Sequence, residues 1–162
     1  MVAISERQYP TRPWVGIGVV LLRDNEVLLV RRGRPPGLGE WSLPGGAQHL
    51  GETAEAAAHR ELAEETGVTA GALVLLAHVD AIHRDNQGRI LYHYTILDFW
   101  GRWLAGAPYA QDDAAEARFV SRGDLASYQL SEAAHVVIER AFNEALLASL
   151  PPPAWSTPDS DR

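Results

Sequence analysis

Apolar and polar positions alternate in blocks along the first third of the chain. Residues 14–22 are rich in valine, leucine and isoleucine, which is typical of a buried strand. Asp24 and Asn25 favour a tight turn, and residues 26–31 form a second apolar block. We therefore predict a β-hairpin, followed by a loop over residues 33–46, where prolines and glycines gather.

Two segments are predicted to be helical. Residues 54–66 consist of good helix formers, with Thr53 suited to the N-cap and Gly67 at the position of a helix end. Residues 131–150 form the second helix, and its apolar positions recur at helical spacing. This predicted apolar face comprises Ala134, Val137, Ile138, Ala141, Ala145 and Leu146.

The remaining pattern predicts further strands. Residues 72–82 and 89–100 are two long strands joined by a turn at residues 85–88, and residues 117–120 form a short one. Strands interleaved with helices are typical of an α/β domain whose helices pack on a sheet. The strand over residues 91–100 fits either a base pocket or the interface of a homodimer.

The composition excludes several classes of enzyme. The chain has no cysteine, which excludes thiol catalysis, thiolate metal sites and disulfides. All 14 cationic side chains are arginine. Without lysine the chain has neither a P-loop nor a Schiff-base amine, so a side-chain cation that binds phosphate must be arginine.

Length and charge narrow the choice further. A chain of 162 residues is the size of one ordinary domain, which we place over residues 1–150, with a disordered proline-rich tail over residues 151–162. The net charge of −7 argues against a nucleic-acid binder. No apolar run approaches membrane-spanning length, and the first residues lack the pattern of a secretory signal. We expect a cytoplasmic protein.

The first helix carries three acids on one side. Glu61, Glu64 and Glu65 are related by helical spacings of three and four, and Arg60 precedes them. Residues 44–46 allow the backbone to approach and to present carbonyl oxygens beside the carboxylates. Such oxygen ligands suit Mg²⁺ or Mn²⁺. The alternative interpretation is a solvated acidic face.

Residues 46–68 resemble the Nudix box. The preceding residues 41–45 are similar to the usual lead-in to that box, and the likeness extends over about residues 14–128. Every fixed position of the signature is filled. These positions are Gly46, Glu52, Arg60, Glu61, Glu64, Glu65 and Gly67, with Leu62 and Val68 at the aliphatic ones.

The resemblance implies both a fold and a reaction. The fold is an α/β/α sandwich with a mixed β-sheet, in which the box forms a loop, a helix and a loop. The reaction is the hydrolysis, by metal-activated water, of a pyrophosphate bond in a nucleoside diphosphate linked to another moiety. The cofactor is Mg²⁺ or Mn²⁺, and the partner is a small-molecule nucleotide.

The resemblance also assigns roles to residues of this chain. The implied metal ligands are the carbonyl of Gly45 and the carboxylates of Glu61, Glu64 and Glu65. Glu52 either supports the geometry of the loop and the helix or reaches a metal as well. The expected catalytic residues are Glu64, Glu116 and Arg60. Arg60 also supports the geometry of the loop and the helix. Glu116, from a later acidic loop, is one candidate for the general base, and Glu64 is the other; a solvated loop acid is the alternative for Glu116.

Substrate-binding candidates lie outside the acidic helix. Arg31, Arg32 and Arg34 form a basic cluster suited to phosphate oxygens, although a solvated basic turn is the alternative. Trp41 suits stacking on a base, and a structural anchor is the alternative.

Three functions are consistent with the sequence. Residues 28–32 and 112–120 resemble the ADP-ribose pyrophosphatase-like subgroup, which favours an ADP-ribose-like substrate. The proline that many ADP-ribose hydrolases carry beyond the box is absent. The alternatives are a nucleoside triphosphate pyrophosphatase that removes oxidised nucleotides and a catalytically silent nucleotide sensor.

Overall fold

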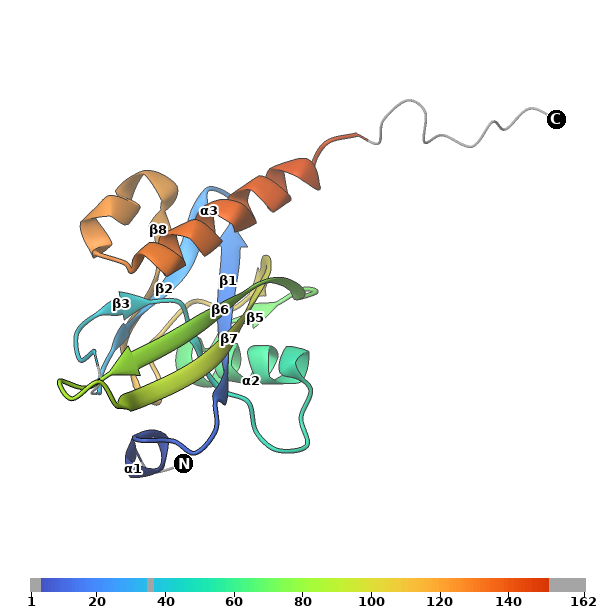
Figure 1. Ribbon diagram of the computed structural model, residues 1–162. Coiled ribbons are helices and arrows are strands. Elements are labelled where there is room, and N and C mark those ends of the chain that lie inside the picture. Colours follow the sequence, from blue (N-terminus) through green and yellow to red (C-terminus); the bar gives the residue numbers. More distant parts are fainter. Residues whose placement is uncertain (1–3, 35–36, 152–162) are drawn as a thin grey trace.

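The centre of the fold is a pair of parallel strands. The computed structural model describes residues 4–34 and 37–151. Strand β1 (Trp14–Arg23) runs parallel to β7 (Ile90–Ala105) over nine residue pairs, from Trp14 opposite Tyr94 to Leu22 opposite Arg102. The other strand pairs are antiparallel. The sheet is therefore mixed, as predicted (Figure 1).

Six further strands extend this pair. They are β2 (Glu26–Arg32), β3 (Trp41–Ser42), β4 (Gly45–Ala47), β5 (Thr69–Ala70), β6 (Val74–Arg84) and β8 (Ala114–Ser121). Strand β2 pairs with β1, β3 and β8, β4 pairs with β1, and β5 and β6 pair with β7. The predicted turns are confirmed: Asp24 has a φ of +51°, and the Gly88 N–H donates to the Asp85 carbonyl at 2.9 Å.

The observed elements differ from the predicted ones in several places. Strand β6 covers residues 74–84 instead of 72–82, and β7 continues to Ala105 instead of ending at residue 100. The prediction that residues 33–46 form only a loop is wrong. This segment contains β3 and the start of β4, which form by pairing with distant strands. The last strand is longer than residues 117–120, since it pairs with β2 along most of its length. Strand β5 was not predicted, and neither were the short helices α1 (Ile4–Arg7) and η1 (Arg122–Tyr128).

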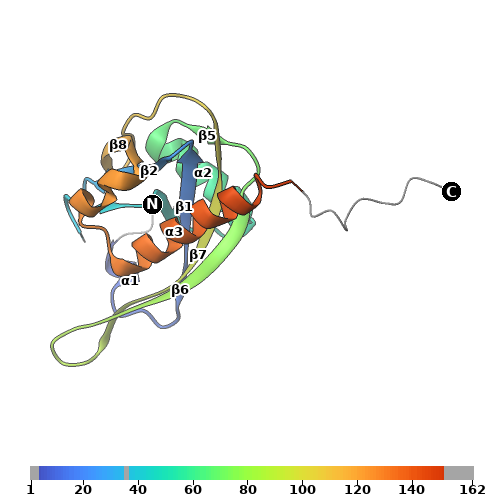
Figure 2. The ribbon, with the colours of Figure 1, turned by 90° about the horizontal axis from the view of Figure 1, so that it is seen from above.

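Helices cover both faces of the sheet (Figure 2). On β1, Val19 and Leu21 pack with Leu62 of helix α2 (Ala54–Thr66). Val20 and Leu22 point to the other face and pack with Ile138 of α3 (Glu132–Leu147). A strand that is buried on both faces is apolar at every position, which explains the unbroken apolar run in β1. The predicted α/β/α sandwich is confirmed.

The helix ends follow local sequence signals. The Thr53 hydroxyl accepts a hydrogen bond from the Ala56 N–H at 3.1 Å, and Gly67 adopts a φ of +69° while its N–H donates to Ala63 at 3.0 Å. Both predicted caps are thereby confirmed.

The predicted apolar face of α3 is correct except at its end. Val137, Ile138, Ala141 and Ala145 are buried, and Phe142, which was not predicted, joins them. Leu146 is 65 % exposed, because the last turn of α3 extends past the sheet (Figure 1). The predicted tail lies outside the described residues apart from Pro151, and the single domain over 1–150 stays a prediction.

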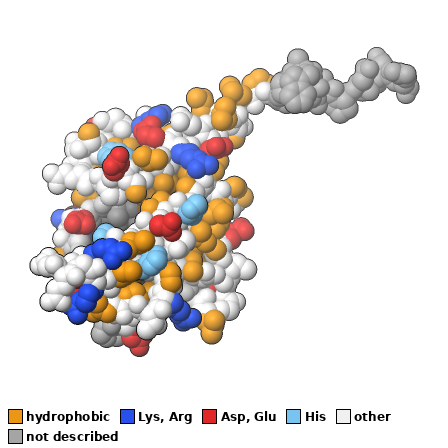
Figure 3. All heavy atoms as spheres, in the orientation of Figure 1, with side chains coloured by type: hydrophobic (Ala, Val, Ile, Leu, Met, Phe, Trp, Pro, Cys, Tyr) orange, Lys and Arg blue, Asp and Glu red, His pale blue; other side chains and the backbone are white. Residues whose placement is uncertain are grey.

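Strand β7 lies inside the sheet, between β1 and β6. Exposed apolar side chains lie on β6, at Val74, Leu75 and Ile82, and on α3, at Val136. Further ones lie near the two ends of β7, at Ile90, Trp103 and Leu104. Apolar groups gather among histidines and charged groups on the face that carries α3 and β6 (Figure 3). The choice between a base pocket and a dimer face for residues 91–100 stays a prediction. No helix among the described residues is long and apolar enough to cross a membrane.

Glycine allows β4 to lie against β1. Gly45 is the register partner of Gly18, and Gly46 that of Ile17. A Cβ on Gly45 would overlap the Ile17 carbonyl oxygen and lie 2.9 Å from its carbonyl carbon. This close approach fixes the start of the box against the central strand.

Replacing Gly45 by alanine tests this contact. We expect Gly45→Ala to lower the free energy of unfolding by roughly 2–3 kcal/mol, because the added methyl group meets backbone atoms that have no room to move. Urea unfolding followed by circular dichroism measures the change. Gly123→Ala is the matched control, since a Cβ there meets nothing within 4 Å. Equal stabilities of the two variants would contradict the packing argument.

Candidate active site

The acids of α2 differ in their exposure. Glu61 is buried, with 9 % of its surface exposed, Glu65 is half-buried, and Glu64 is exposed. All three line one cavity, and so do Glu52, Arg60 and Gly45. The structure therefore brings the expected metal ligands to a single wall.

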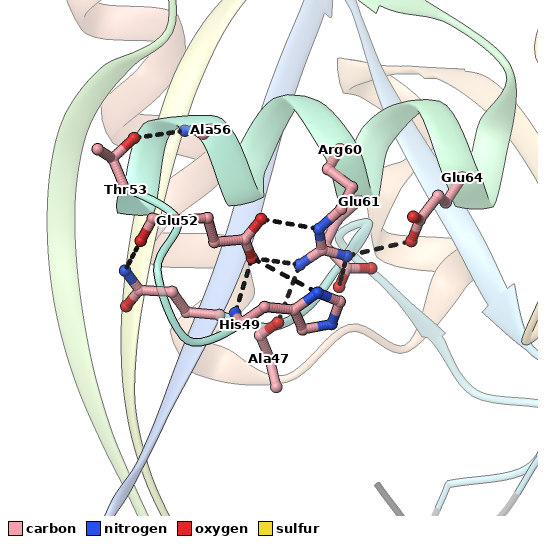
Figure 4. A network of polar contacts seen from close by, with 9 residues as sticks. Ala47, His49, Glu52, Thr53, Ala56, Arg60, Glu61 and Glu64 are labelled. Atoms are coloured by element: carbon pink, nitrogen blue, oxygen red, sulfur yellow. Dashed lines mark hydrogen bonds and ion pairs between the residues drawn. The ribbon is translucent and has the colours of Figure 1, made fainter. Parts of the chain in front are cut away.

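Arg60 is the hub of a network of polar contacts (Figure 4). Its Nη1 donates to Glu61 at 2.8 Å and to Glu64 at 3.1 Å. Its Nη2 donates to Glu52 at 2.6 Å and to the Ala47 carbonyl at 3.1 Å, and its Nε donates to Glu52 at 3.0 Å. One guanidinium thus joins the loop before α2 to two acids on the helix itself.

Glu52 holds that loop in place. Beside the bidentate contact with Arg60, its carboxylate accepts a hydrogen bond from the His49 N–H at 2.7 Å. The hydrogen bonds from Arg60 lower the pKa of Glu52 to about 2, although burial acts in the opposite direction. Glu52 is therefore ionised throughout the physiological range and acts as the anchor of the loop.

Gly45, just before the box, and Gly46, its first residue, make room for the carboxylates of Glu61 and Glu65. The Gly45 N–H donates to Glu65 Oε2 at 3.1 Å. The Glu61 carboxylate lies against the Gly46 backbone, where a Cβ would come within 2.5 Å of its carboxyl carbon. Only glycine fits at position 46 while Glu61 keeps this place.

Burial makes these carboxylates hard to ionise. It raises the pKa of Glu65 to about 7, against the opposing effect of the Gly45 N–H. Burial also raises the pKa of Glu61, against the opposing effect of Arg60. A pair of buried, incompletely compensated carboxylates favours a bound cation.

The donor set fits a hard divalent cation. Carboxylate and carbonyl oxygens are the ligands that Mg²⁺ and Mn²⁺ prefer. Within the described residues no three acidic or histidine side chains are already gathered as one ligand cluster. Glu61 and Glu64 both accept hydrogen bonds from Arg60.

The cavity extends well beyond the acids. Its volume is about 1020 Å³, which is enough for a nucleotide. Asp112 and Asp113, from the loop before β8, line it near α2, and Arg7 and Trp14 line it from the N-terminal segment. The acidic stretch before β8 gave a signal for the first pair. No motif in the sequence marks the second.

Comparisons with known proteins agree with this geometry. The family model for the NUDIX domain matches residues 12–143. The chain belongs to the NUDIX domain family. The box prediction is thereby confirmed at the level of the family.

Two Nudix relatives are similar over much of the chain. An ADP-ribose pyrophosphatase of Methanocaldococcus jannaschii is 37 % identical over 113 residues, which is 70 % of this chain and 64 % of the relative. A putative 8-oxo-dGTP diphosphatase 2 of Mycobacterium tuberculosis is 38 % identical over 96 residues, which is 59 % of this chain and 64 % of the relative. The chain thus spans just under two thirds of the length of each.

A solved Nudix structure shares the fold. The NUDIX domain of Shewanella oneidensis NrtR, complexed with ADP ribose, superposes with a TM-score of 0.70 at 25 % identity. The superposition covers 83 % of this chain and 90 % of that one. The mixed sheet and its two covering helices are therefore those of a Nudix domain.

Glu116 does not belong to the polar network that Arg60 forms with the acids of α2 and the loop before it. It stands on β8 opposite Arg31 of β2, and its carboxylate pairs with Arg31 at 2.5 Å. Its other oxygen pairs with Arg118. Among the described residues that line the cavity, Arg31 is present and Glu116 is not. Glu116 is therefore connected to the cavity by its ion pair with Arg31, which lines it.

The other substrate-binding candidates are divided. Arg32 lines the cavity, whereas Arg34 pairs with Asp113 at 2.9 Å. Trp41 packs edge-on against Tyr128, with ring centroids 5.0 Å apart. The Arg118 guanidinium lies 4.9 Å from the centroid of the Trp41 ring. Its surroundings are those of an anchor on the α3 side of the sheet. The roles of these residues stay predictions.

Replacing Glu65 by glutamine tests the electrostatics without any assay of activity. Because its folded pKa of about 7 exceeds its ordinary value of 4.5, stability is lost as the pH rises from below 4.5 through 7. In chelator at pH 8, we expect Glu65→Gln to unfold with a free energy roughly 1–3 kcal/mol above that of the parent, and at pH 4 with an equal one. Urea unfolding at pH 4, 6 and 8 measures this.

The control for this prediction is Glu55→Gln, an exposed acid on the same helix. We expect that variant to follow the parent at each pH. A Glu65→Gln difference that does not change with pH would show that burial leaves the ionisation of Glu65 unaffected.

Proposed function

We propose that this Nudix protein hydrolyses the pyrophosphate bond of a nucleoside diphosphate linked to another moiety, with ADP-ribose as the favoured substrate. The observation that carries the proposal is the placement of Glu61, Glu65 and the Gly45 backbone on the wall of a nucleotide-sized cavity. The ADP-ribose pyrophosphatase relative and the ADP-ribose complex of a Nudix domain support this substrate.

Mg²⁺ or Mn²⁺ would be held by the carbonyl of Gly45 and the carboxylates of Glu52, Glu61, Glu64 and Glu65. When bound, the cation supplies charge neutralisation of the diphosphate and acidifies a coordinated water. The fit rests on the oxygen donors and on the raised pKa of Glu65, which a neighbouring cation would lower again.

The residues of the chain perform the rest of the reaction. Arg31 and Arg32 bind non-bridging phosphate oxygens from the cavity wall, and Arg60 fixes the orientation of Glu61 and Glu64. Water adds to one phosphorus as the bridging P–O bond breaks, and an ionised carboxylate accepts the proton of the water. We assign that role to Glu64, because it is exposed and lines the cavity. From ADP-ribose the products are AMP and ribose 5-phosphate.

A second candidate function has its own support. The M. tuberculosis relative is a putative 8-oxo-dGTP diphosphatase, which favours hydrolysis of oxidised nucleoside triphosphates by the same site. For either function the partner is a small nucleotide rather than nucleic acid, in keeping with the net charge of −7. The absence of cysteine suits a cytoplasmic location.

A substrate panel tests the proposed function. We expect AMP and ribose 5-phosphate to form from ADP-ribose in the presence of Mg²⁺ or Mn²⁺. Their formation should stop in excess chelator, because the site offers oxygens but no thiol or amine nucleophile. Glu64→Gln should lower kcat by roughly 10²-fold or more. Chromatography of the products measures both.

Each part of this test has a contrary outcome. Full turnover in excess chelator would exclude the metal site. A kcat/KM for 8-oxo-dGTP well above that for ADP-ribose would replace the favoured substrate with the second candidate. Binding of nucleotides without hydrolysis of any would identify a sensor.

The contact between Glu116 and Arg31 generates a further prediction. We expect Glu116→Gln to raise KM roughly 10-fold and to change kcat less, because the acid positions a phosphate-binding arginine. Asp112→Asn and Asp113→Asn are the comparison, since both acids line the cavity itself. A large fall in kcat at unchanged KM, confined to Glu116→Gln, would instead identify Glu116 as the general base.

A further inference from the structure

The N-terminal segment supplies a basic and aromatic wall to the cavity. Arg7 of α1, Arg12 and Trp14 all line it. The Arg7 guanidinium lies 5.9 Å from the centroid of the Trp14 ring. Within residues 4–34 and 37–151, neither Arg7 nor Arg12 forms an ion pair. Positive charge on this wall is therefore available to a ligand.

Two arginines of this cavity each have a buried donor without a hydrogen-bond partner in the described part of the chain. Among the described residues, the buried side-chain polar atoms without a hydrogen-bond partner are Arg7 Nε and Arg31 Nε. Both arginines line the cavity. A buried N–H group without an acceptor is costly and rare, and it calls for a partner such as a ligand or an ordered water.

The position of Arg7 selects the kind of acceptor. The Arg7 guanidinium lies over the indole ring of Trp14, and a cation held over an aromatic ring still has N–H groups for hydrogen bonding. Those donors match phosphate and hydroxyl oxygens better than the face of a base. The neighbouring Arg12 adds a second cation on the same wall.

The segment that carries Arg7 is anchored. The Tyr9 N–H donates to the Leu91 carbonyl at 3.0 Å, and its hydroxyl donates to Asp85 at 3.0 Å. The Gln8 amide donates to the Tyr92 hydroxyl at 3.0 Å. These contacts hold the segment on the hairpin of β6 and β7, so Arg7 is fixed before a ligand arrives.

We propose that Arg7, lying over the Trp14 ring and assisted by Arg12, forms a subsite for a phosphorylated pentose. This inference rests on the proposed function, in which each half of the substrate is a pentose phosphate: AMP carries adenine, and ribose 5-phosphate does not. Arg7 binds the oxygens of one half while the α2 acids act at the bond between the halves. The subsite thus determines which substrates the cavity holds.

Binding of the two products in chelator tests the subsite independently of catalysis. Equilibrium dialysis measures Kd for AMP and for ribose 5-phosphate with the full chain, with Arg7→Gln and with Arg140→Gln. Arg140 is an exposed arginine of α3 outside this cavity and serves as the matched control. We expect Arg7→Gln to weaken one product roughly 10- to 100-fold, and that product identifies the half that Arg7 holds. Arg140→Gln should leave both unchanged.

Steady-state kinetics and a second variant complete the experiment. For ADP-ribose we expect Arg7→Gln to raise KM by a similar factor, with kcat changed only a few-fold. Arg7→Lys keeps the charge but lacks the Nε donor, so it should restore binding only in part. It also replaces Arg7→Gln if that variant unfolds, as judged by circular dichroism.

The outcomes separate this subsite from the proposed function. Unchanged Kd values for both products in folded Arg7 variants, or a parent protein that binds neither product, would overturn the subsite. If the parent hydrolyses ADP-ribose and the Arg7 variants match it in KM and Kd, the function stands and the subsite falls. If the parent hydrolyses nothing, yet Arg7→Gln loses one product, the subsite stands and the function falls.

Discussion

The active site depends on one backbone contact, in which β4 lies against β1 without side chains between them. Gly45 faces Gly18, and any Cβ on Gly45 would meet the Ile17 backbone. This contact places the Gly45 N–H on Glu65 and leaves space at Gly46 for the Glu61 carboxylate. Both carboxylates become buried as a result, and their burial is the source of their raised pKa values. The chemistry of the site thus begins with the packing of two strands.

The carboxylates of the site share the positive charge of Arg60 unequally. Arg60 contacts Glu52, Glu61 and Glu64, and its bidentate contact goes to Glu52. That contact stabilises the loop, because it lowers the pKa of the loop acid. Glu65 receives a backbone N–H instead of a guanidinium, and its pKa rises to about 7. Arg60 therefore stabilises the loop, while Glu65 has, among the described residues, no cationic side chain as a hydrogen-bond partner, at the position where we propose a bound cation.

Local signals in the sequence predicted the fold best. The caps of α2 depend on Thr53 and Gly67 alone, and the buried strands follow from runs of apolar residues. Features that depend on distant partners escaped prediction. Strand β4 forms by pairing with β1, which is distant in the sequence. Leu146 is exposed because the last turn of α3 extends past the sheet. The box acids were placed from their helical spacing, whereas the pairing of Glu116 with Arg31 depends on the register of two strands far apart in the chain.

The box cannot by itself select a substrate. ADP-ribose and nucleoside triphosphates share the phosphoanhydride bond that the α2 acids face, so contacts to that group bind them alike. Discrimination must come from contacts with the groups on either side of it. In our proposal those contacts come from Arg31 of β2, Arg7 of α1 and Trp14 of β1, which line the cavity and lie outside the box. Proteins that share the box can thus differ in substrate through side chains that the box does not include.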